Sequence, residues 1–209
     1  MANTLKFGNG QWATGNGTAL AYNDENSNFK PLPFDFTRAS SGTTVNQSGL
    51  IETVGSGIPR IDFLGNTKGA LLLEPSRTNL IPYSEDFSNA AWNKGTGTII
   101  ENVSISPDGT LSADKFTSAT TASFAFLSET MSANASQTYT YSIWIKKVSG
   151  SGVLKLAISD VILATTTSAN ISLTTEFVRY SFTIASGDLS NTGLIGVGFI
   201  NMTSGDVIE

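Results

Sequence analysis

The side chains that most enzymes use for catalysis are scarce in this chain of 209 residues, which contains no cysteine and no histidine. Their absence excludes a cysteine nucleophile, a serine–histidine pair, a histidine base and an ordinary zinc site within these residues. It also excludes disulfide bonds, so packing or assembly must supply the stability. Any catalysis would have to depend on carboxylates, tyrosine, lysine or hydroxyl groups.

The carboxylates do not form a convincing catalytic pair. Glycoside hydrolysis needs two of them about 5 to 10 Å apart, whereas Glu85 and Asp86 are adjacent in the chain and such neighbours usually point apart. Asp108 lies in a "PDG" turn that explains it by backbone hydrogen bonding, and Asp160 and Glu176 stand alone. We expect no enzymatic activity and no cofactor. Calcium held by loop oxygens, including those of Glu85 or Asp86, is chemically reasonable, so the presence of a metal stays open.

An aromatic ring on a polar strand face offers a different chemistry, the binding of sugars. Side chains alternate along a strand, so Trp144 and Lys146 share the more polar side of "TYTYSIWIKK", and Arg179 lies on the mixed side of "FVRYSFTI". The C–H face of a pyranose stacks on an aromatic ring while polar groups bond its hydroxyls. We therefore predict a glycan site at Trp144, Lys146 and Arg179. The more ordinary alternative is that the N-terminal region or a sister subunit covers Trp144.

The elements that would position these residues are short strands. Turn residues, as in "SPDGT", "SGSG" and "SGDLSNTG", separate segments with no sustained helical period. The charged fraction is 14 %, and Thr, Ser and Asn replace the missing charges, which favours strands and turns. The pattern predicts an all-β fold, an antiparallel β-sandwich. The expected strands are 98–104, 113–118, 122–129, 138–148, 152–159, 176–185 and 194–201.

Residues 1–68 differ from the rest of the chain. Gly and Asn recur there, apolar residues occur in ones and twos, and Pro31 and Pro33 disfavour helix. "NQSGLIETV" is typical of a turn that leads into a short strand. We predict an extended, loop-rich region that lies on a partner or wraps a sister subunit. A disordered tail is the alternative, but Trp12 and Phe29 are too apolar for a merely solvated segment.

Arg77 follows an apolar strand in "EPSRTNL". An arginine at this point could grip Glu52, Asp62 or Glu74 and fix the course of the chain. A structural clamp is favoured over a ligand-binding role.

The charge distribution narrows the choice of partners. The net charge is −5, and the largest basic cluster is the pair Lys146 and Lys147, which argues against nucleic acid. No apolar run approaches 18 residues, so we expect no membrane span. The start of the chain, "MANTLKFGNGQW", lacks the apolar core of a signal peptide, which disfavours a secreted bacterial sugar-binding module.

Residues 34–92 carry a series of short signatures. These are "FTRAS", "GLIE", a Pro-Arg before an apolar–acidic pair, and "LLLEPSRTNL". Together they resemble bacteriophage virion proteins, especially tail fibres and head spike or head fibre proteins. "NLIPYSEDFSNAAW", "YTYSIWIKKVSGSG" and "TTEFVRYSFTI" are similar to the landmarks of a carbohydrate-binding-module-like jelly roll. Residues 5–36 resemble the N-terminus of fibres of phages of Bacteroides-type hosts, including crAss-like phages.

The resemblance implies a location in the virion and different roles for the two parts of the chain. Residues 1–68 would anchor the protein to capsid, portal-collar or tail proteins, and residues 69–209 would form a jelly roll that lacks its last strand. A homotrimer and attachment to host-surface carbohydrate are the expected assembly and role. The alternatives are a spacer or docking module without a ligand, and the N-terminal part of a longer polysaccharide depolymerase tailspike. Head or tail attachment and the identity of the sugar stay undetermined.

Overall fold

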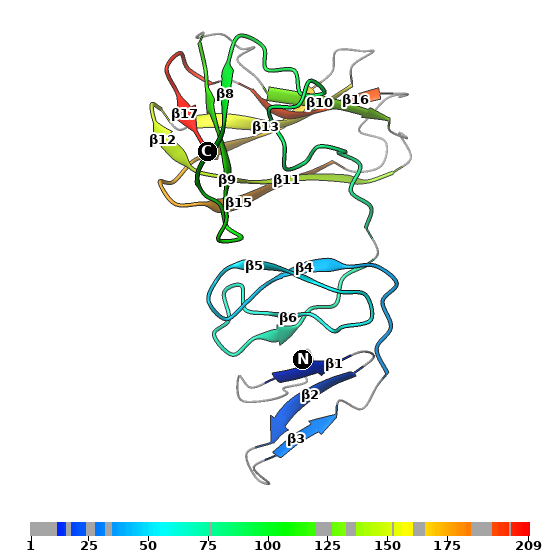
Figure 1. The fold of residues 1–209 in the computed structure, drawn as a ribbon. Coiled ribbons are helices and arrows are strands. Elements are labelled where there is room, and N and C mark those ends of the chain that lie inside the picture. The colour runs from blue at the N-terminus through cyan, green and yellow to red at the C-terminus, as the bar shows by residue number, and fades with distance from the viewer. Residues whose placement is uncertain are drawn as a thin grey trace. The chain divides into compact units, whose positions relative to one another are not determined.

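The fold is built from short antiparallel strands (Figure 1). The computed structural model describes residues 12–15, 18–23, 28–31, 35–75, 77–119, 127–132, 137–151, 153–160, 166–184, 194–200 and 202–209. In those ranges there is no helix, and hence none that could cross a membrane. Every described strand pair is antiparallel, which confirms the predicted all-β class.

The chain divides into two compact units. The N-terminal unit comprises Met1–Arg77 with Pro107–Gly109, and the C-terminal unit comprises Thr78–Ser106 with Thr110–Glu209. The anchoring role of residues 1–68 and the absence of a last strand in the jelly roll are not tested by this division and stay predictions.

The N-terminal unit consists of small sheets joined by loops, which agrees with its predicted loop-rich character. β1 (Trp12–Gly15), β2 (Thr18–Asn23) and β3 (Asn28–Pro31) form one sheet in that order. β4 (Gly42–Val45) pairs with β5 (Ile51–Val54), and β6 (Ile61–Asp62) pairs with β7 (Ala70–Leu71). The turn between β4 and β5 contains Gly49 at φ 82°, a conformation that glycine adopts without strain. β5 confirms the short strand predicted in "NQSGLIETV".

An arginine holds the loops of the N-terminal unit together. The guanidinium of Arg38 donates to four backbone carbonyls, at distances of 2.5 Å for Ser40, 3.2 Å for Val54, 2.7 Å for Gly55 and 2.9 Å for Ile58. Hydrogen bonds from a charged donor contribute more than neutral ones. Few hydrophobic side chains of this unit are buried among the described residues, so these bonds replace part of a hydrophobic core.

Replacing this arginine is expected to loosen the N-terminal unit. Arg38→Gln removes the charged donor from several carbonyls at once, and we expect a loss of about 2 to 4 kcal/mol in the free energy of unfolding of the unit. Hydrogen exchange of the amides in residues 35–75 would measure it. Arg77→Gln, at an exposed position, is the matched control. Equal protection in Arg38→Gln and wild type would contradict this account, and a larger effect of Arg77→Gln would favour the predicted clamping role of Arg77.

The C-terminal unit contains the other strands in three sheets. β12 (Lys147–Ser149), β17 (Val207–Ile208), β9 (Leu111–Thr117) and β8 (Thr98–Ile105) form one sheet in that order. β10 (Leu127–Ser132), β16 (Leu194–Ile200), β13 (Val153–Asp160) and β14 (Thr166–Ser172) form the second, and β11 (Tyr139–Ile145) pairs with β15 (Val178–Ile184).

Each of the seven predicted strands has a counterpart here. The predicted strand 138–148 is divided between β11 and β12. Residues 122–126 of the predicted strand 122–129 lie outside the described residues, and its end overlaps β10. β14 and β17 are additional strands that the pattern did not predict.

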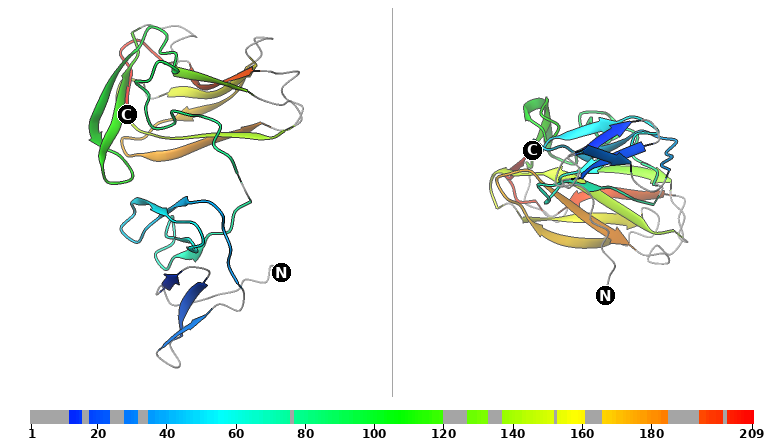
Figure 2. Two further views of the ribbon diagram at one scale, coloured as in Figure 1. Left: turned by 45° about the vertical axis from the view of Figure 1, so that its right-hand side comes forward. Right: turned by 90° about the horizontal axis from the view of Figure 1, so that it is seen from below.

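The hydrophobic core lies between β13 on one side and the β11–β15 pair on the other, and Figure 2 shows these strands in separate layers. Every second residue of β13 points into the core, and the facing strands do the same. The core residues of these three strands are Leu154, Leu156, Ile158, Tyr141, Ile145 and Ile184. Leu156 is 0 % exposed. Two sheet layers around one core confirm the predicted antiparallel sandwich.

A buried carboxylate ties two turns of the sandwich together. Asp206 is 3 % exposed. Its Oδ1 accepts the N–H of Ser151 at 2.6 Å, and its Oδ2 accepts the Ser151 hydroxyl at 2.9 Å and the N–H of Thr203 at 2.7 Å. Gly150, at φ 92°, lies so close that a Cβ atom there would collide with this carboxylate. The turn between β12 and β13 is therefore fixed to the turn before β17.

Asp206→Ala is expected to destabilise the C-terminal unit by about 3 kcal/mol, since it removes the buried acceptor of three hydrogen bonds. Urea unfolding followed by tryptophan fluorescence would measure the change. Glu85→Ala, which removes an exposed carboxylate of the same unit, is the control and should differ from wild type by less than about 0.5 kcal/mol. An Asp206→Ala protein as stable as this control would show that the carboxylate is dispensable.

Candidate functional site

The outward side of the β11–β15 pair carries the predicted site residues Trp144 and Arg179. Alternate residues of both strands belong to the core or pack against it, so the residues between them point away from it. We name this outward surface the polar face. Its residues are Thr140, Ser142, Trp144, Arg179, Ser181 and Thr183. Four of them are exposed, and Ser142 and Trp144 are half-buried.

The pairing of the two strands places Trp144 directly opposite Arg179. Directly opposite residues have Cβ atoms about 4.5 to 5.5 Å apart, so the two side chains leave the sheet from neighbouring positions on the same face. Arg179 Nη2 donates to Ser142 Oγ at 3.0 Å. The polar face runs over about 13 Å from Thr140 to Trp144, at about 3.3 Å per residue. It thus combines an aromatic ring, a cation and hydroxyl groups along a length suited to a short oligosaccharide.

The hydroxyls of this face were not among the predicted site residues. The Oγ1 atoms of Thr140 and Thr183 lie 2.8 Å apart across the two strands. Hydroxyls both donate and accept, so they suit the hydroxyls of a sugar. The alternation that selected Trp144 could also have selected these residues.

Lys146 takes part in a different set of contacts. Its Nζ lies 3.0 Å from Glu209 Oε2, 3.4 Å from Ser104 Oγ and 4.5 Å from the centre of the Phe177 ring. The side chains of Lys146 and Glu209 are 22 % and 11 % exposed. The charge of Lys146 is therefore compensated by Glu209, and its role in a glycan site stays a prediction.

The carboxyl group of Glu209 is tuned by these neighbours. Burial raises its pKa, but hydrogen bonds from Ser104 and Lys146 and the charges of Lys146 and Lys115 outweigh burial, so the pKa lies below its usual value of 4.5. A lowered pKa in the folded state means that the ionised group stabilises the fold above pH 4.5. This stabilisation is lost as the pH falls through the lowered pKa.

The pH dependence of stability should reveal this ion pair. Below about pH 4.5, the free energy of unfolding of the wild type should fall more steeply than that of Glu209→Gln, because the variant has no carboxylate to protonate. Urea midpoints measured from about pH 6 to pH 3 would test it. Glu176→Gln, at an exposed carboxylate, serves as control. Parallel curves for wild type and Glu209→Gln would exclude a stabilising role for the pair.

Arg77 is exposed, and the carboxylates considered for it have other partners. Glu74 Oε2 lies 2.8 Å from Arg60 Nη2. Glu52 and Asp62 accept hydrogen bonds from β4 and the turn that follows it. The clamping role proposed for Arg77 is not tested by these contacts and stays a prediction, whereas Arg38 and Arg60 make the bonds that a clamp requires.

The adjacent pair Glu85 and Asp86 occupies a tight turn. The carboxylate of Asp86 accepts the Ser88 hydroxyl at 2.7 Å and the Asn89 N–H at 3.1 Å. The hydrogen bond from Ser88 keeps the pKa of Asp86 below its usual value. Asp86 thus forms part of a turn motif, and Glu85 is exposed. No group of three or more metal-binding side chains occurs in the part of the chain that the structure describes.

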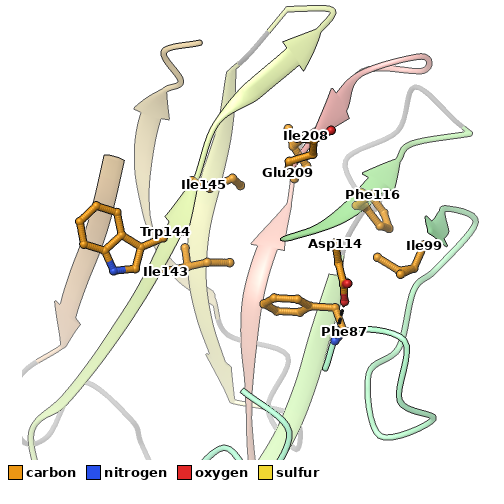
Figure 3. A pocket seen from close by; sticks show the side chains of 9 residues that line it. All are labelled: Phe87, Ile99, Asp114, Phe116, Ile143, Trp144, Ile145, Ile208 and Glu209. Atoms are coloured by element: carbon orange, nitrogen blue, oxygen red, sulfur yellow. Dashed lines mark hydrogen bonds between the residues drawn. The ribbon is translucent and has the colours of Figure 1, made fainter. Parts of the chain in front are cut away.

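A small cavity lies on the other side of β11 from the polar face (Figure 3). It has a volume of about 30 Å³, which holds one or two water molecules and is too small for a sugar ring. Apolar side chains form most of its wall, and Asp114 accepts the N–H of Phe87 at its edge. Figure 3 shows Ile143 directed toward Phe87, whereas the indole of Trp144 points away. At this volume the cavity is no candidate for a glycan site.

Tyr141 belongs to the hydrophobic core. Its side chain is 5 % exposed, and burial raises the pKa of its hydroxyl. Among the described residues the hydroxyl has no hydrogen-bond partner. It stays neutral at physiological pH and contributes to the core.

Comparison with known proteins gives likenesses in structure alone. No family model and no curated protein matches the sequence. A carbohydrate-binding module of family 4 has a TM-score of 0.45 at 16 % identity, over 62 % of this chain and 94 % of the module. A family 61 module in complex with β-1,4-galactotriose has a TM-score of 0.43 at 15 % identity, over 63 % of this chain and 93 % of the module.

A third solved structure is the enzymatically active domain of tailspike protein 4 of bacteriophage CBA120. Its TM-score is 0.41 at 12 % identity, over 59 % of this chain and 19 % of the tailspike chain. TM-scores below 0.5 do not establish a shared fold, and these likenesses identify no ligand for this protein. The geometry of its own residues must carry the functional argument.

Proposed function

We propose that this protein is a non-catalytic structural component of a phage virion, a fibre or spike, that attaches to host-surface glycans through the polar face. The observation that carries the glycan part is the position of Trp144 opposite Arg179 among hydroxyl groups. The virion part is supported by the resemblance of residues 34–92 to phage fibre and spike proteins.

The polar face suits a sugar for physical reasons. A pyranose presents an apolar C–H surface to an aromatic ring and hydroxyls at its rim. Trp144 supplies the ring, and Arg179, Ser181 and Thr183 supply exposed polar groups along the same face of the sheet. Such an open face binds weakly, because it excludes little water from the ligand.

Assembly would compensate for weak single sites. In the proposed arrangement, residues 1–68 attach the chain to capsid, portal-collar or tail proteins, and the chain forms a homotrimer. Several copies on one particle raise the effective concentration of sites at the host surface, so the avidity exceeds the affinity of one face.

Trp144→Ala is expected to weaken glycan binding by at least about tenfold, since a tryptophan at the centre of a contact commonly contributes more than 1.4 kcal/mol. The full chain would be applied to a microarray of bacterial surface oligosaccharides, and circular dichroism would verify that the variant folds. Val153→Ala, which shortens an exposed side chain on β13, should leave binding unchanged.

Two results would contradict the proposal. If the wild-type chain binds no glycan and phage carrying Trp144→Ala adsorbs normally, the protein is a spacer or docking module. If incubation of particles with host capsule releases oligosaccharide and a longer form of this protein is responsible, the depolymerase alternative holds instead.

A further inference from the structure

Arg179 differs from the other cations whose contacts the structure gives. Arg60 pairs with Glu74, and Lys146 pairs with Glu209. Lys94 donates to backbone carbonyls, as Arg38 does. Arg179 is exposed, and within the described residues it makes a single hydrogen bond, to a serine hydroxyl, and no ion pair.

The strands around Arg179 leave its charge uncompensated. The segments 139–145 and 178–184 contain no other charged residue. The nearest acid along the chain is Glu176, and no salt bridge joins it to Arg179 in the described structure. The protein as a whole has 17 acidic and 12 basic residues. A lone arginine on an acid-free face of an acidic protein creates a local positive site.

The guanidinium is only partly engaged within the described structure. Its bond to Ser142 uses one Nη2 hydrogen, and an arginine has five N–H donors. The donors that are not engaged can meet a carboxylate through two parallel hydrogen bonds, a geometry in which arginine exceeds lysine. A phosphate or sulfate group commonly draws several cations, whereas this face offers one. A planar carboxylate beside a sugar ring therefore fits best.

We infer that the glycan is acidic: a sugar that bears a carboxylate pairs with Arg179 while its ring stacks on Trp144. This inference rests on the proposed function, because it concerns the same face. Arg179 then determines specificity, and Trp144 supplies affinity for sugar rings in general.

The test compares each glycan with its own carboxyl-reduced form, in which the carboxylate has become an uncharged alcohol and the ring is unchanged. The wild-type chain should bind its best glycans at least about tenfold more tightly than their reduced forms at low salt. The difference should shrink at about 1 M salt, where the Debye length is about 3 Å. Arg179→Gln should lose the preference and keep residual binding to both forms.

Lys155→Gln is the matched control, because it lowers the net charge by the same amount on β13 of the other sheet. Lys155→Gln should keep the preference for the carboxylate form over the carboxyl-reduced form. The inference is overturned if the best glycans are neutral or carry only phosphate or sulfate, or if Arg179→Gln retains the preference for carboxylates. Binding to neutral glycans that depends on Trp144 would leave the proposed function intact. Absence of binding to every glycan would remove both.

Discussion

The register of the β11–β15 pair is the constraint on which the rest of the C-terminal unit depends. Tyr141, Ile145 and Ile184 must point inward to meet β13, because burying these side chains supplies much of the stability of the sandwich. Side chains alternate with a period of two, so a slip of one residue would turn every one of them to the other face. The same register therefore directs Trp144 and Arg179 outward and sets them opposite each other. The register that stabilises the core therefore also fixes the geometry of the candidate site.

The charged residues divide into two groups around this core. Asp206 and Glu209 accept hydrogen bonds that tie together turns and strands, and Asp114 bridges the N–H groups of Phe87 and Asn102. These carboxylates serve the fold. Arg179 belongs to the second group, the charged residues that take no part in these hydrogen-bond networks. Arg179 carries a charge that no acid compensates among the described residues, and it lies opposite Trp144 on the polar face.

Strand periodicity was sufficient to predict the fold class, most strands of the sandwich and the outward position of Trp144. β14 escaped prediction because "TTSANIS" is mostly small and polar, with Ala169 and Ile171 as its only apolar residues, and β17 because two residues carry no periodic signal. The partner of Lys146 could not be foreseen, since Glu209 meets it through pairing between segments distant in sequence. The same holds for Arg38, whose carbonyl partners come from separate loops, whereas Arg77 attracted attention through its neighbours in sequence. Local patterns predict which way a side chain points, and long-range pairing decides what it meets there.

The central claim is that the outward face of β11 and β15 binds glycan. Titration of the isotope-labelled chain with the best-binding acidic oligosaccharide, followed by amide and indole chemical shifts, tests it most directly. The account predicts that the largest chemical-shift changes fall on the residues of the polar face, above all Trp144 and Arg179. The changes around the cavity near Phe87 should be small. Changes concentrated elsewhere in the chain, with the Trp144 indole unaffected, would contradict it.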